Sequence, residues 1–564
     1  MRNVDSHFSM NPVSQDISRS TFLQKWSHLT TCNAGKLIPV SIQEVLPGDT
    51  FSLDTNVIAR MTTPIVPVMD DAYLDIYHFF VPNRLVWKHW KNLMGENTDS
   101  AWVSDTVYQV PHITYNTSSS NTLVGTNVDY FGLPVGLLYS NDSYFIPLGN
   151  ISVNALPFRG LRLIWNEWFR DQNVSDPKLI NDGDTETDTT LFDLYPVGKF
   201  HDYFTSVLPS PQKGPSVPLP VTGTAPVIPG LNMHTGNNFL RFNVTDNGLA
   251  TNDTLPLGIS GLSSGNDTTV KGFDNALSGV GLTINGTNLE ANFDSVTLGT
   301  INQLRQAFQV QKLYERDARG GTRYIEQIRS HFGVISPDAR MQRPEYLGGE
   351  RVNVNMTQVV QTSGTIDGSG DTPQGNTAAY SLTRSRQNSY TKSFTEHGFV
   401  FCLCCIRTHQ SYCQGINRMW SRKNRLDYYY PVFANLGEQA VLNKEIYARG
   451  YDDIQNTDDE VFGYQEAWAE YRYTPSTISG AFRPNFAGGS LAFWHYGNDF
   501  RSLPTYSEEF IYENDENVKR TLAVSAADGE DPSSVPQFIL SFSFVNKATR
   551  KIPMYSIPGL IDHH

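Results

Sequence analysis

Short segments in which apolar and polar residues alternate occur near both ends of the 564-residue chain. One segment places Leu74, Ile76, His78 and Phe80 on a single face, and a second does so with Phe538, Leu540, Phe542 and Phe544. Alternation with a period of two predicts β-strands that bury one face. Because such strands are spread along the chain, distant segments have to pair. The pattern predicts a mainly β sandwich or jelly roll with long connections, not a string of independent domains.

Two further apolar runs and four helices complete the expected elements. Residues 399–406 form a nearly continuous apolar run, which is typical of a strand covered on both faces, and residues 491–496 look similar. The clearest helix spans 301–319, with Thr300 and Gln303 as a capping box and Gly320 after its last turn. The other expected helices span 84–94, 161–170 and 436–448.

The segment 222–300 differs in composition from the rest of the chain. It is rich in Gly, Asn and Thr, it carries few charges, and a Pro-rich stretch (209–229) leads into it. A connection this long far exceeds the usual loop of about 12–15 residues, which indicates a functional or disordered segment. We interpret 222–300 as a protrusion inserted into the surface of a single domain that spans 1–564.

The charge of the chain limits its partners and its location. The net charge is −14, so a uniformly nucleic-acid-binding surface is not expected. Charged residues make up only 18% and aromatic residues 12%, which suits a surface largely covered by neighbouring subunits, although secreted β proteins look similar. We see no apolar core of a signal peptide at the N-terminus and no apolar stretch long enough to span a membrane.

Four of the five cysteines crowd one segment: Cys402, Cys404, Cys405 and Cys413. Without an export signal, reduced thiols are expected. His397 and His409 lie nearby, so a zinc site is conceivable, but structural zinc ligands usually come in pairs on turns and not inside an apolar strand. We therefore favour core packing over a metal site or a disulfide, and we expect no cofactor.

Acidic residues alternate at Asp182, Asp184, Glu186 and Asp188. A calcium loop would need glycine where Thr187 stands and glutamate where Asp193 stands, so a solvated acidic loop is the favoured interpretation. Glu167 and Asp171 have helical spacing, and we expect them to pair with Arg170 or Arg162, or to face a neighbouring subunit, rather than to act in catalysis. The sequence contains no nucleophile elbow, phosphate-binding loop or zinc-protease motif, so we predict no enzymatic activity.

Basic residues near the two termini are candidates for nucleic-acid contact. Arg2, Arg19, Lys25 and Lys36 lie in what we expect to be an N-terminal arm without strong strand signals. A second group near the C-terminus contains Lys547, Arg550 and Lys551. Both groups could hold phosphates electrostatically, and the alternative is that these side chains simply face solvent.

Several specific segments resemble the major capsid protein of the gokushovirus branch of the microviruses, small single-stranded DNA phages. They include EVLPGD at 44–49, FFVPNRL at 79–85, WNEWFRDQN at 165–173, ERDARGGTR at 315–323, RPEYLGG at 343–349, FTEHGF at 394–399, NRMWSR at 417–422, LGEQAVLNKE at 436–445, FGYQE at 462–466 and YSIPGLIDH at 555–563. The resemblance covers nearly the whole chain and is weakest over 222–300.

The resemblance implies an eight-stranded antiparallel jelly roll with long loop insertions and a few helices. It implies self-assembly into a T=1 icosahedral shell around a single-stranded DNA genome, packaged with a small basic protein. It also implies a protrusion that contacts a host cell receptor, for which 222–300 is the candidate segment. We assign Asn237, Asn252, Asn266 and Asn285 to the host-contact surface. The alternatives are an exported carbohydrate-binding β-sandwich, which the aromatic residues would suit, and a cytosolic zinc-binding β protein.

Overall fold

The computed structural model describes residues 18–96, 107–116, 123–215 (apart from 136, 140–144 and 148), 217, short strands between 221 and 298, 301–320, 324–333, 342–364, 374–450 (apart from 376), 457–523 and 536–555. The chain divides into two compact units, one made of Met1–Pro211 with Gly320–His564 and the other of Gln212–Arg319. None of the helices that the structure describes is both long enough and apolar enough to cross a bilayer.

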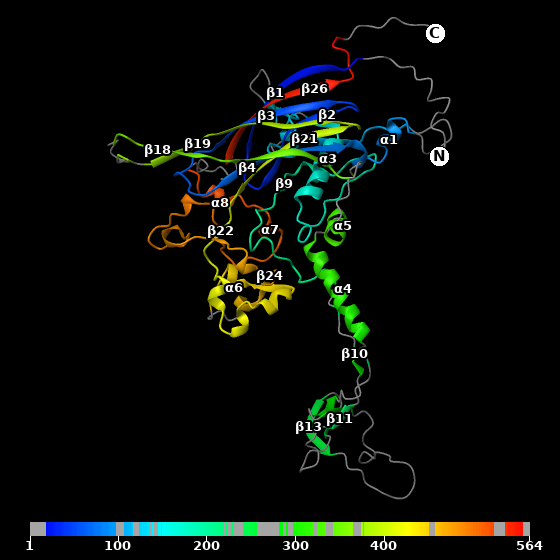
Figure 1. Ribbon diagram of the computed structural model, residues 1–564, viewed down its shortest axis with the longest axis vertical. Helices are drawn as coiled ribbons and strands as arrows, with labels where there is room; N and C mark the ends of the chain where they lie inside the picture. The colour runs from blue at the N-terminus through cyan, green and yellow to red at the C-terminus, as the bar shows by residue number, and fades with distance from the viewer. Residues whose placement is uncertain are drawn as a thin grey trace. The chain divides into compact units, whose positions relative to one another are not determined.

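Two antiparallel sheets form the centre of the larger unit (Figure 1). The four-stranded sheet has the order β1 (Ser20–Cys32), β26 (Phe538–Arg550), β3 (Thr50–Met61), β20 (Thr383–Ser393). The five-stranded sheet has the order β17 (Glu345–Asn353), β4 (Ala72–Pro82), β21 (Gly398–Thr408), β2 (Lys36–Val45), β9 (Tyr195–Pro196). The first long strand pairs with the last along its whole length, from Ser20 opposite Arg550 to Cys32 opposite Phe538. The prediction that distant segments pair is therefore confirmed.

The main core lies between the two sheets. The predicted inward faces of β4 and β26 are confirmed, because Leu74, Ile76, Phe538, Leu540, Phe542 and Phe544 are all buried in it. They meet inward side chains of β2, β3 and β21. His78 is also buried here, packed against the ring of Tyr390 at 5.4 Å, and burial lowers its pKa to about 3. The imidazole therefore stays neutral and acts as a core side chain.

A second core covers the other face of the five-stranded sheet. Helix α3 (Leu156–Ile164) and the π-turn η2 (Trp165–Phe169) pack there against Phe399, Phe401 and Leu403 of β21. Gly160 permits the close approach, since a Cβ at that position would lie 3.0 Å from the ring of Phe401. Residues 399–406 are thus a strand covered on both faces, as predicted.

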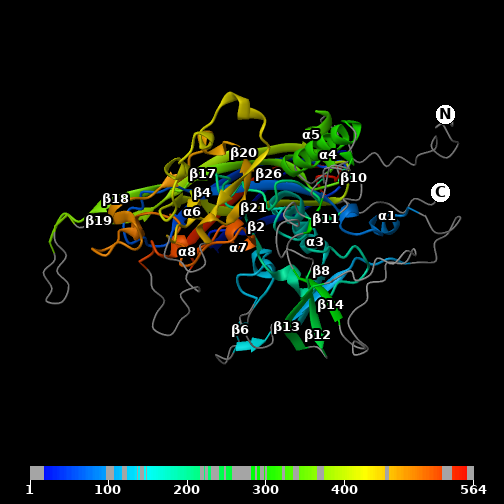
Figure 2. The same ribbon diagram turned by 90° about the horizontal axis from the view of Figure 1, so that it is seen from below.

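Shorter elements surround the sandwich in the larger unit. The paired strands are β5 (His112–Asn116) with β8 (Asn150–Asn154), β6 (Leu137–Tyr139) with β7 (Phe145–Pro147), β18 (Met356–Val360) with β19 (Thr377–Ser381), β22 (Ser411–Tyr412) with β25 (Ser476–Thr477), and β23 (Glu438–Leu442) with β24 (Val461–Glu466). The short α-helices are α1 (Trp90–Leu93), α2 (Asn127–Tyr130), α5 (Tyr324–Phe332), α6 (Asn443–Ile446), α7 (Glu508–Ile511) and α8 (Glu516–Lys519). The β18–β19 hairpin projects away from the sheets in both ribbon views (Figures 1 and 2).

The smaller unit is built as a ladder of antiparallel pairs. Strands β10 (Val221–Thr222) and β16 (Thr297–Leu298) pair at its base, followed by β11 (Val227–Pro229) with β15 (Leu289–Ala291). A three-stranded sheet has the order β13 (Leu249–Pro256), β12 (Arg241–Asp246), β14 (Gly281–Asn285). Helix α4 (Ile301–Arg319) confirms the predicted helix at both ends, although Thr300, its proposed cap, lies outside the described residues.

Three predicted elements differ from the structure. The expected helix 436–448 is replaced by strand β23 and one helical turn, α6, because pairing of β23 with β24 overrides local helix propensity. The expected strand 491–496 is a 3-10 turn (η10, Ala492–Trp494), whose backbone bonds to the loop at Met69 instead of to a strand. The expected helix 84–94 is reduced to a 3-10 turn (η1, Asn83–Leu85) and α1. Helix 161–170 is present, but it begins earlier, at Leu156, and ends as η2.

Candidate assembly and nucleic-acid surfaces

The cysteine cluster packs in the core, as favoured. Cys402 and Cys404 point between the sheets, Cys405 points into the second core, and all three are buried free thiols. Burial raises the pKa of the Cys405 thiol to about 12, so it is protonated and unreactive at neutral pH. Cys413 is only partly buried. Within the described residues, no three His, Cys, Asp or Glu side chains gather closely enough to hold a metal ion.

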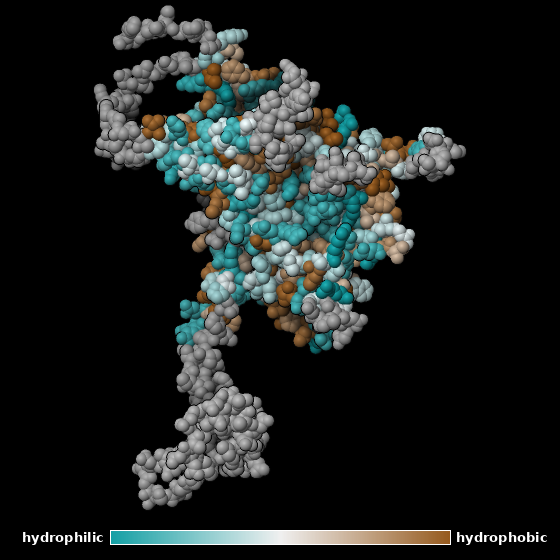
Figure 3. Space-filling model, turned by 180° about the vertical axis from the view of Figure 1, so that it is seen from behind, coloured by the Kyte–Doolittle hydropathy of each residue, from teal (hydrophilic) through white to brown (hydrophobic). Residues whose placement is uncertain are grey.

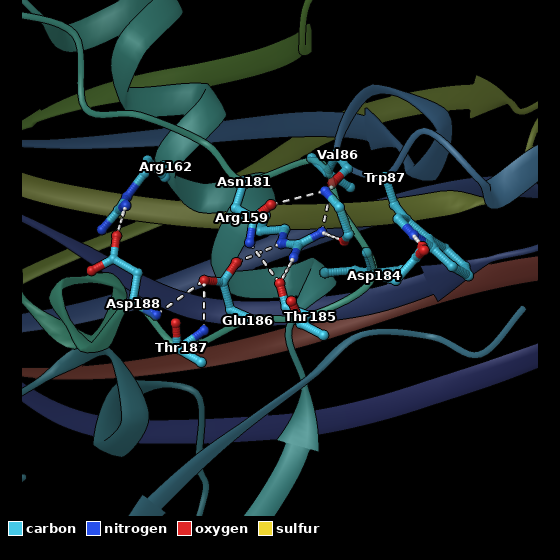
Figure 4. A network of polar contacts seen from close by, with 12 residues as sticks. Val86, Trp87, Arg159, Arg162, Asn181, Asp184, Thr185, Glu186, Thr187 and Asp188 are labelled. Carbon is cyan, nitrogen blue, oxygen red and sulfur yellow. Dashed lines mark hydrogen bonds and ion pairs between the residues drawn. The ribbon is translucent and has the colours of Figure 1, made fainter.

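The interpretation of the acidic segment 182–188 as a solvated loop is confirmed for Asp182 and Asp184, which are exposed, but was wrong for Glu186. Glu186 is buried and its Oε2 accepts from Arg159 Nε at 2.8 Å (Figure 4). The same guanidinium donates to the carbonyl oxygens of Val86, Gly183 and Thr185. The other Glu186 oxygen accepts from two backbone N–H groups, at Thr187 and Asp188. The carboxylate thus fastens its own segment to α3.

Its two acidic neighbours have similar structural roles. Asp184 accepts from the indole of Trp87 at 2.8 Å and lies 2.7 Å from the ring of His89; the hydrogen bond from His89 contributes most to the lowering of the Asp184 pKa. Asp188 pairs with Arg162 at 2.5 Å. Sequence reasoning missed these pairs because the partners lie about 25 or more residues away in the chain.

The expected partners of Glu167 and Asp171 are also corrected in part. The guanidinium of Arg162 donates hydrogen bonds to the side chains of Asp188, Tyr195 and Thr190. Arg170 donates to the carbonyl of Ser175 at 2.8 Å. Asp171 accepts from the backbone N–H of Asn173. These groups shape the turn after α3, and none of their recorded contacts builds a pair of facing carboxylates.

The predicted nucleic-acid residues do not form one arm. Arg2 lies outside the described residues. Lys25 lies within the long strand β1, and Arg19 just before it donates to Gly48 O and to Thr50 Oγ1 on β3. Lys36 begins β2 and therefore belongs to the other sheet. The prediction of an arm was wrong because β1 carries polar residues on both faces, which hides the alternation of apolar and polar residues that indicates a strand.

The C-terminal basic group is also divided between two sides of a strand. Lys547 is exposed on the outer side of β26. Arg550 turns the other way, 3.1 Å from the buried carboxylate of Asp49, with its guanidinium over the ring of Phe51. Of the proposed host-contact residues, Asn252 lies in β13 and Asn285 ends β14, whereas Asn237 and Asn266 lie outside the described residues.

The outer side of the four-stranded sheet forms what we call the open sheet face. Its outward positions are Thr21, Leu23, Lys25, Ser27, Leu29 and Thr31 of β1; Ile539, Ser541, Ser543, Val545, Lys547 and Thr549 of β26; Thr50, Ser52, Asp54, Asn56, Ile58 and Arg60 of β3; and Arg384, Arg386, Asn388, Thr391 and Ser393 of β20. Leu29 is 76% exposed and Leu23 57%, in contrast to the covered side of β21. Sequence reasoning missed Arg60, Arg384 and Arg386, although the two-residue spacing of the last two was a strand signal.

A second unusual surface, the aromatic surface, is built by the loop after β22 and the turn after β24. Its members are large apolar side chains that remain exposed: Met419, Trp420, Leu426, Tyr428, Tyr429, Tyr430, Val432, Leu436, Tyr471 and Tyr473. Trp420 is 75% exposed and Val432 is 87% exposed. Figure 3 shows that hydrophobic side chains lie among hydrophilic ones on one face of the molecule and do not merge into a single apolar patch.

The aromatic surface is held by a rigid base. Trp468 packs against Tyr429, Phe433 and Tyr471, and its indole donates to the carbonyl of Phe433 at 3.2 Å. Its φ of 67° is rare for a bulky residue, so the surrounding contacts have to stabilise a strained backbone. Arg422 lies over the rings of Tyr428 and Tyr471 and pairs with Glu470 at 2.9 Å. The loop is therefore fixed in place while its apolar tips stay exposed.

Comparisons with known proteins identify the family. The family model described as "Capsid protein (F protein)" matches residues 11–560. The chain is 40% identical to capsid protein VP1 of Bdellovibrio phage phiMH2K over 96% of this chain and 95% of that protein. It is 37% identical to VP1 of Chlamydia phage 1 (99% and 98%) and 38% identical to VP1 of Spiroplasma virus 4 (94% and 93%).

The matched range 11–560 includes the sandwich, the smaller unit and the aromatic surface. They favour a shell protein over the exported carbohydrate-binding sandwich and over the zinc-binding β protein. The chain belongs to the capsid-protein family of the microviruses, with relatives in the gokushovirus branch, and is a structural protein of the virion and not an enzyme.

Proposed function

We propose that the chain is an eight-stranded jelly roll that self-assembles into a T=1 icosahedral shell around a single-stranded DNA genome. The observation that carries the fold is the strand order. In chain order, β1, β3, β20 and β26 fall in one sheet, whereas β2, β4, β17 and β21 fall in the other. The chain crosses between the sheets repeatedly and its first and last long strands are neighbours, which is the connectivity of a jelly roll.

The aromatic surface supports the assembly step. Tyr, Trp, Met and Arg are the residue types enriched where proteins meet, and exposed apolar clusters mark interaction sites. We assign this surface to a second copy of the chain, because subunits of a shell-forming family have each other as their main neighbours.

Particle formation tests this assignment. Sixty copies of the 63.2 kDa chain give a particle of about 3.8 MDa, which electron microscopy and sedimentation detect directly. Trp420→Ser combined with Val432→Ser should leave the subunit folded and prevent shells. The control is Leu179→Ser, which replaces an equally exposed apolar residue away from the aromatic surface and should leave assembly intact. Normal shells from the double variant would contradict the assignment.

We extend the proposal to host attachment through the insertion 222–300. The support is that Gln212–Arg319 forms a compact unit separate from the sandwich. The ladder also brings the two ends of the insertion together, since Thr222 lies opposite Thr297. A protein module joined through one paired stem can vary without disturbing the shell-building part.

The paired stem shows where to cut. Replacing residues 223–296 with a short Gly/Ser turn joins two strands that already lie side by side. Shells should still form, and binding of particles to host cells should be lost. Absence of shells would contradict the separation of the two roles, and unchanged binding to cells would contradict the host-contact role of the insertion.

The strongly acidic chain also suits a small basic DNA-packaging protein as a partner. A net charge of −14 cannot neutralise a genome, so counter-charge has to come from elsewhere. Mass spectrometry of purified virions should find a basic polypeptide in a fixed ratio to the capsid chain.

A further inference from the structure

We infer that the open sheet face binds the phosphate backbone of single-stranded nucleic acid, through Lys25, Arg60, Arg384, Arg386 and Lys547. The inference rests on the proposed function, because it makes this face the inner wall of the shell. It goes further by naming the side chains and the way in which they recognise the ligand.

The first step is the distribution of charge. The outward positions of the four strands carry five cations and a single carboxylate, Asp54, in a chain whose net charge is −14. The face is positively charged although the chain as a whole is negatively charged, and a positively charged face attracts a polyanion. The same sign excludes a small basic protein as the occupant, because like charges would repel it.

The second step is the availability of these cations. Elsewhere in the described chain, several arginines are engaged by carboxylates, as Arg159 is by Glu186 and Arg407 by Asp75. Within the described residues, none of the five cations of the open sheet face has a recorded side-chain hydrogen bond or ion pair, and all five are exposed. Unpaired guanidinium and ammonium groups are donors for phosphate oxygens.

The third step is their arrangement. Register places Arg386 in one row with Asn56, Ser543 and Ser27, and Arg384 in the next row with Ile58, Ser541 and Leu29. Lys547 lies between Leu23 and Ser52. At a strand spacing of about 4.8 Å, the cations extend across roughly 14 Å from β20 to β1. The face offers a broad field of donors, with serine hydroxyls between the cations.

The fourth step concerns what the face lacks. None of its outward positions holds an aromatic residue, so bases have no ring on which to stack. Contacts to phosphates carry no sequence information. Binding should therefore depend strongly on salt and hardly at all on base sequence.

The experiment uses the unassembled full chain, separated from particles by size exclusion. The probe is a fluorescein-labelled oligothymidylate of about thirty nucleotides, longer than the roughly 4–16 nucleotides that a single-strand-binding OB fold covers, and its binding is followed by anisotropy. A variant with Lys25, Arg384, Arg386 and Lys547 all changed to Gln should bind at least tenfold more weakly at about 0.1 M salt, with a shallower salt dependence. Oligothymidylate and oligodeoxyadenylate should bind within about threefold of each other.

The control removes the same charge from other exposed positions. Lys88, Lys91, Lys213 and Arg501 are exposed and lie outside the open sheet face, and their change to Gln should weaken binding by less than about threefold. Equal losses in the two quadruple variants, or no binding by the unsubstituted chain, would overturn the inference. Particles counted by electron microscopy report on the proposed function separately: if the quadruple variant forms normal shells and its unassembled chain binds the probe as tightly as the unsubstituted chain does, the inference alone is refuted.

Discussion

The two outer faces of the sandwich differ, because one is covered by other segments of the chain and the other is exposed. The outer face of the five-stranded sheet is covered by α3, η2 and the segment around Tyr512, which bury Phe399, Phe401 and Leu403. The outer face of the four-stranded sheet keeps Leu23, Leu29 and its cations exposed. Both sheets share one inner core, so burial between the sheets cannot explain the difference.

The difference shows which of the two sheets the long connections of this chain cover. The segments between β4 and β17 and between β21 and β26 supply the covering layer, including the buried pair Arg159–Glu186. β3 and β26 of the other sheet alternate in burial, with one face turned to the core and the other to solvent, as in an antiparallel sheet facing water. One face has become part of the fold, and the other remains available for a ligand.

The largest expected effect is on the covered face, from Arg159→Met. The change leaves Glu186 buried without its counter-charge, which should lower the free energy of unfolding by about 3–5 kcal/mol. Chemical denaturation measures the loss. Lys519→Met is the control, since its pairs with Asp515 and Glu516 are partly exposed and should contribute less than about 1 kcal/mol. Similar losses would show that the covering layer is not fastened by the buried pair.

A matched pair of truncations compares the faces directly. Leu403→Ala on the covered side of β21 should cost about 3 kcal/mol, because it removes apolar contacts and leaves a cavity. Ile539→Ala on the open sheet face should cost less than about 1 kcal/mol, because the side chain is already 42% exposed. Equal costs would mean that the open sheet face is covered in the folded subunit.

The covering layer also contains a carboxyl group that should make stability depend on pH. Glu513 is buried against Thr408 and Gln410, and burial raises its pKa to about 7 from 4.5, while Lys199 acts in the opposite direction. The folded state holds this proton between about pH 4.5 and 7 and the unfolded state does not, so stability should fall as the pH rises through that window.

Glu513→Gln should remove this contribution to the pH dependence, which amounts to on the order of 3 kcal/mol between the two limits. Unfolding at a series of pH values measures it, with exposed Glu509→Gln as the control that should leave the slope unchanged. An unaltered slope in the Glu513 variant would assign the pH dependence to other groups.

The smallest expected effect is on the open sheet face. The quadruple change of Lys25, Arg384, Arg386 and Lys547 to Gln should alter the free energy of unfolding by less than about 1 kcal/mol, since the four side chains have no recorded partners among the described residues. A larger loss in thermal or chemical unfolding would mean that these cations hold the fold together. Their role would then be structural.

Prediction from the sequence succeeded where a local pattern and the fold agree. The alternation at 74–80 and 538–544, the apolar run at 399–406 and the helix Ile301–Arg319 were all confirmed. It failed at 436–448 and 491–496, where a partner from elsewhere in the chain decides the backbone. β1 was missed because its inner face carries Gln24, His28 and Thr30, so its alternation in polarity is weak.

The candidate surfaces were predicted less well than the fold. Of the residues predicted for nucleic-acid contact, Lys25 lies on the open sheet face and Lys36 belongs to the other sheet, whereas Arg60, Arg384 and Arg386 were not considered. In the chain, Arg60 lies more than three hundred positions from Arg384 and Arg386. Only the register of β20 on β3 brings the three residues onto one face. The aromatic surface was visible only as the motif NRMWSR, with no sign that its apolar side chains would stay exposed.

By itself, the sequence determined that this protein is a β-rich shell subunit with a compositionally distinct insertion. Strand periodicity and family motifs are local properties of the chain, and they can be recognised without knowing which residues are in contact. Only the tertiary structure decided which acidic residues are buried, which basic residues share a face, and which side of the sandwich is covered. Those outcomes depend on strand register and on distant counter-charges, because burial and pairing are properties of neighbours in space and not of neighbours in sequence.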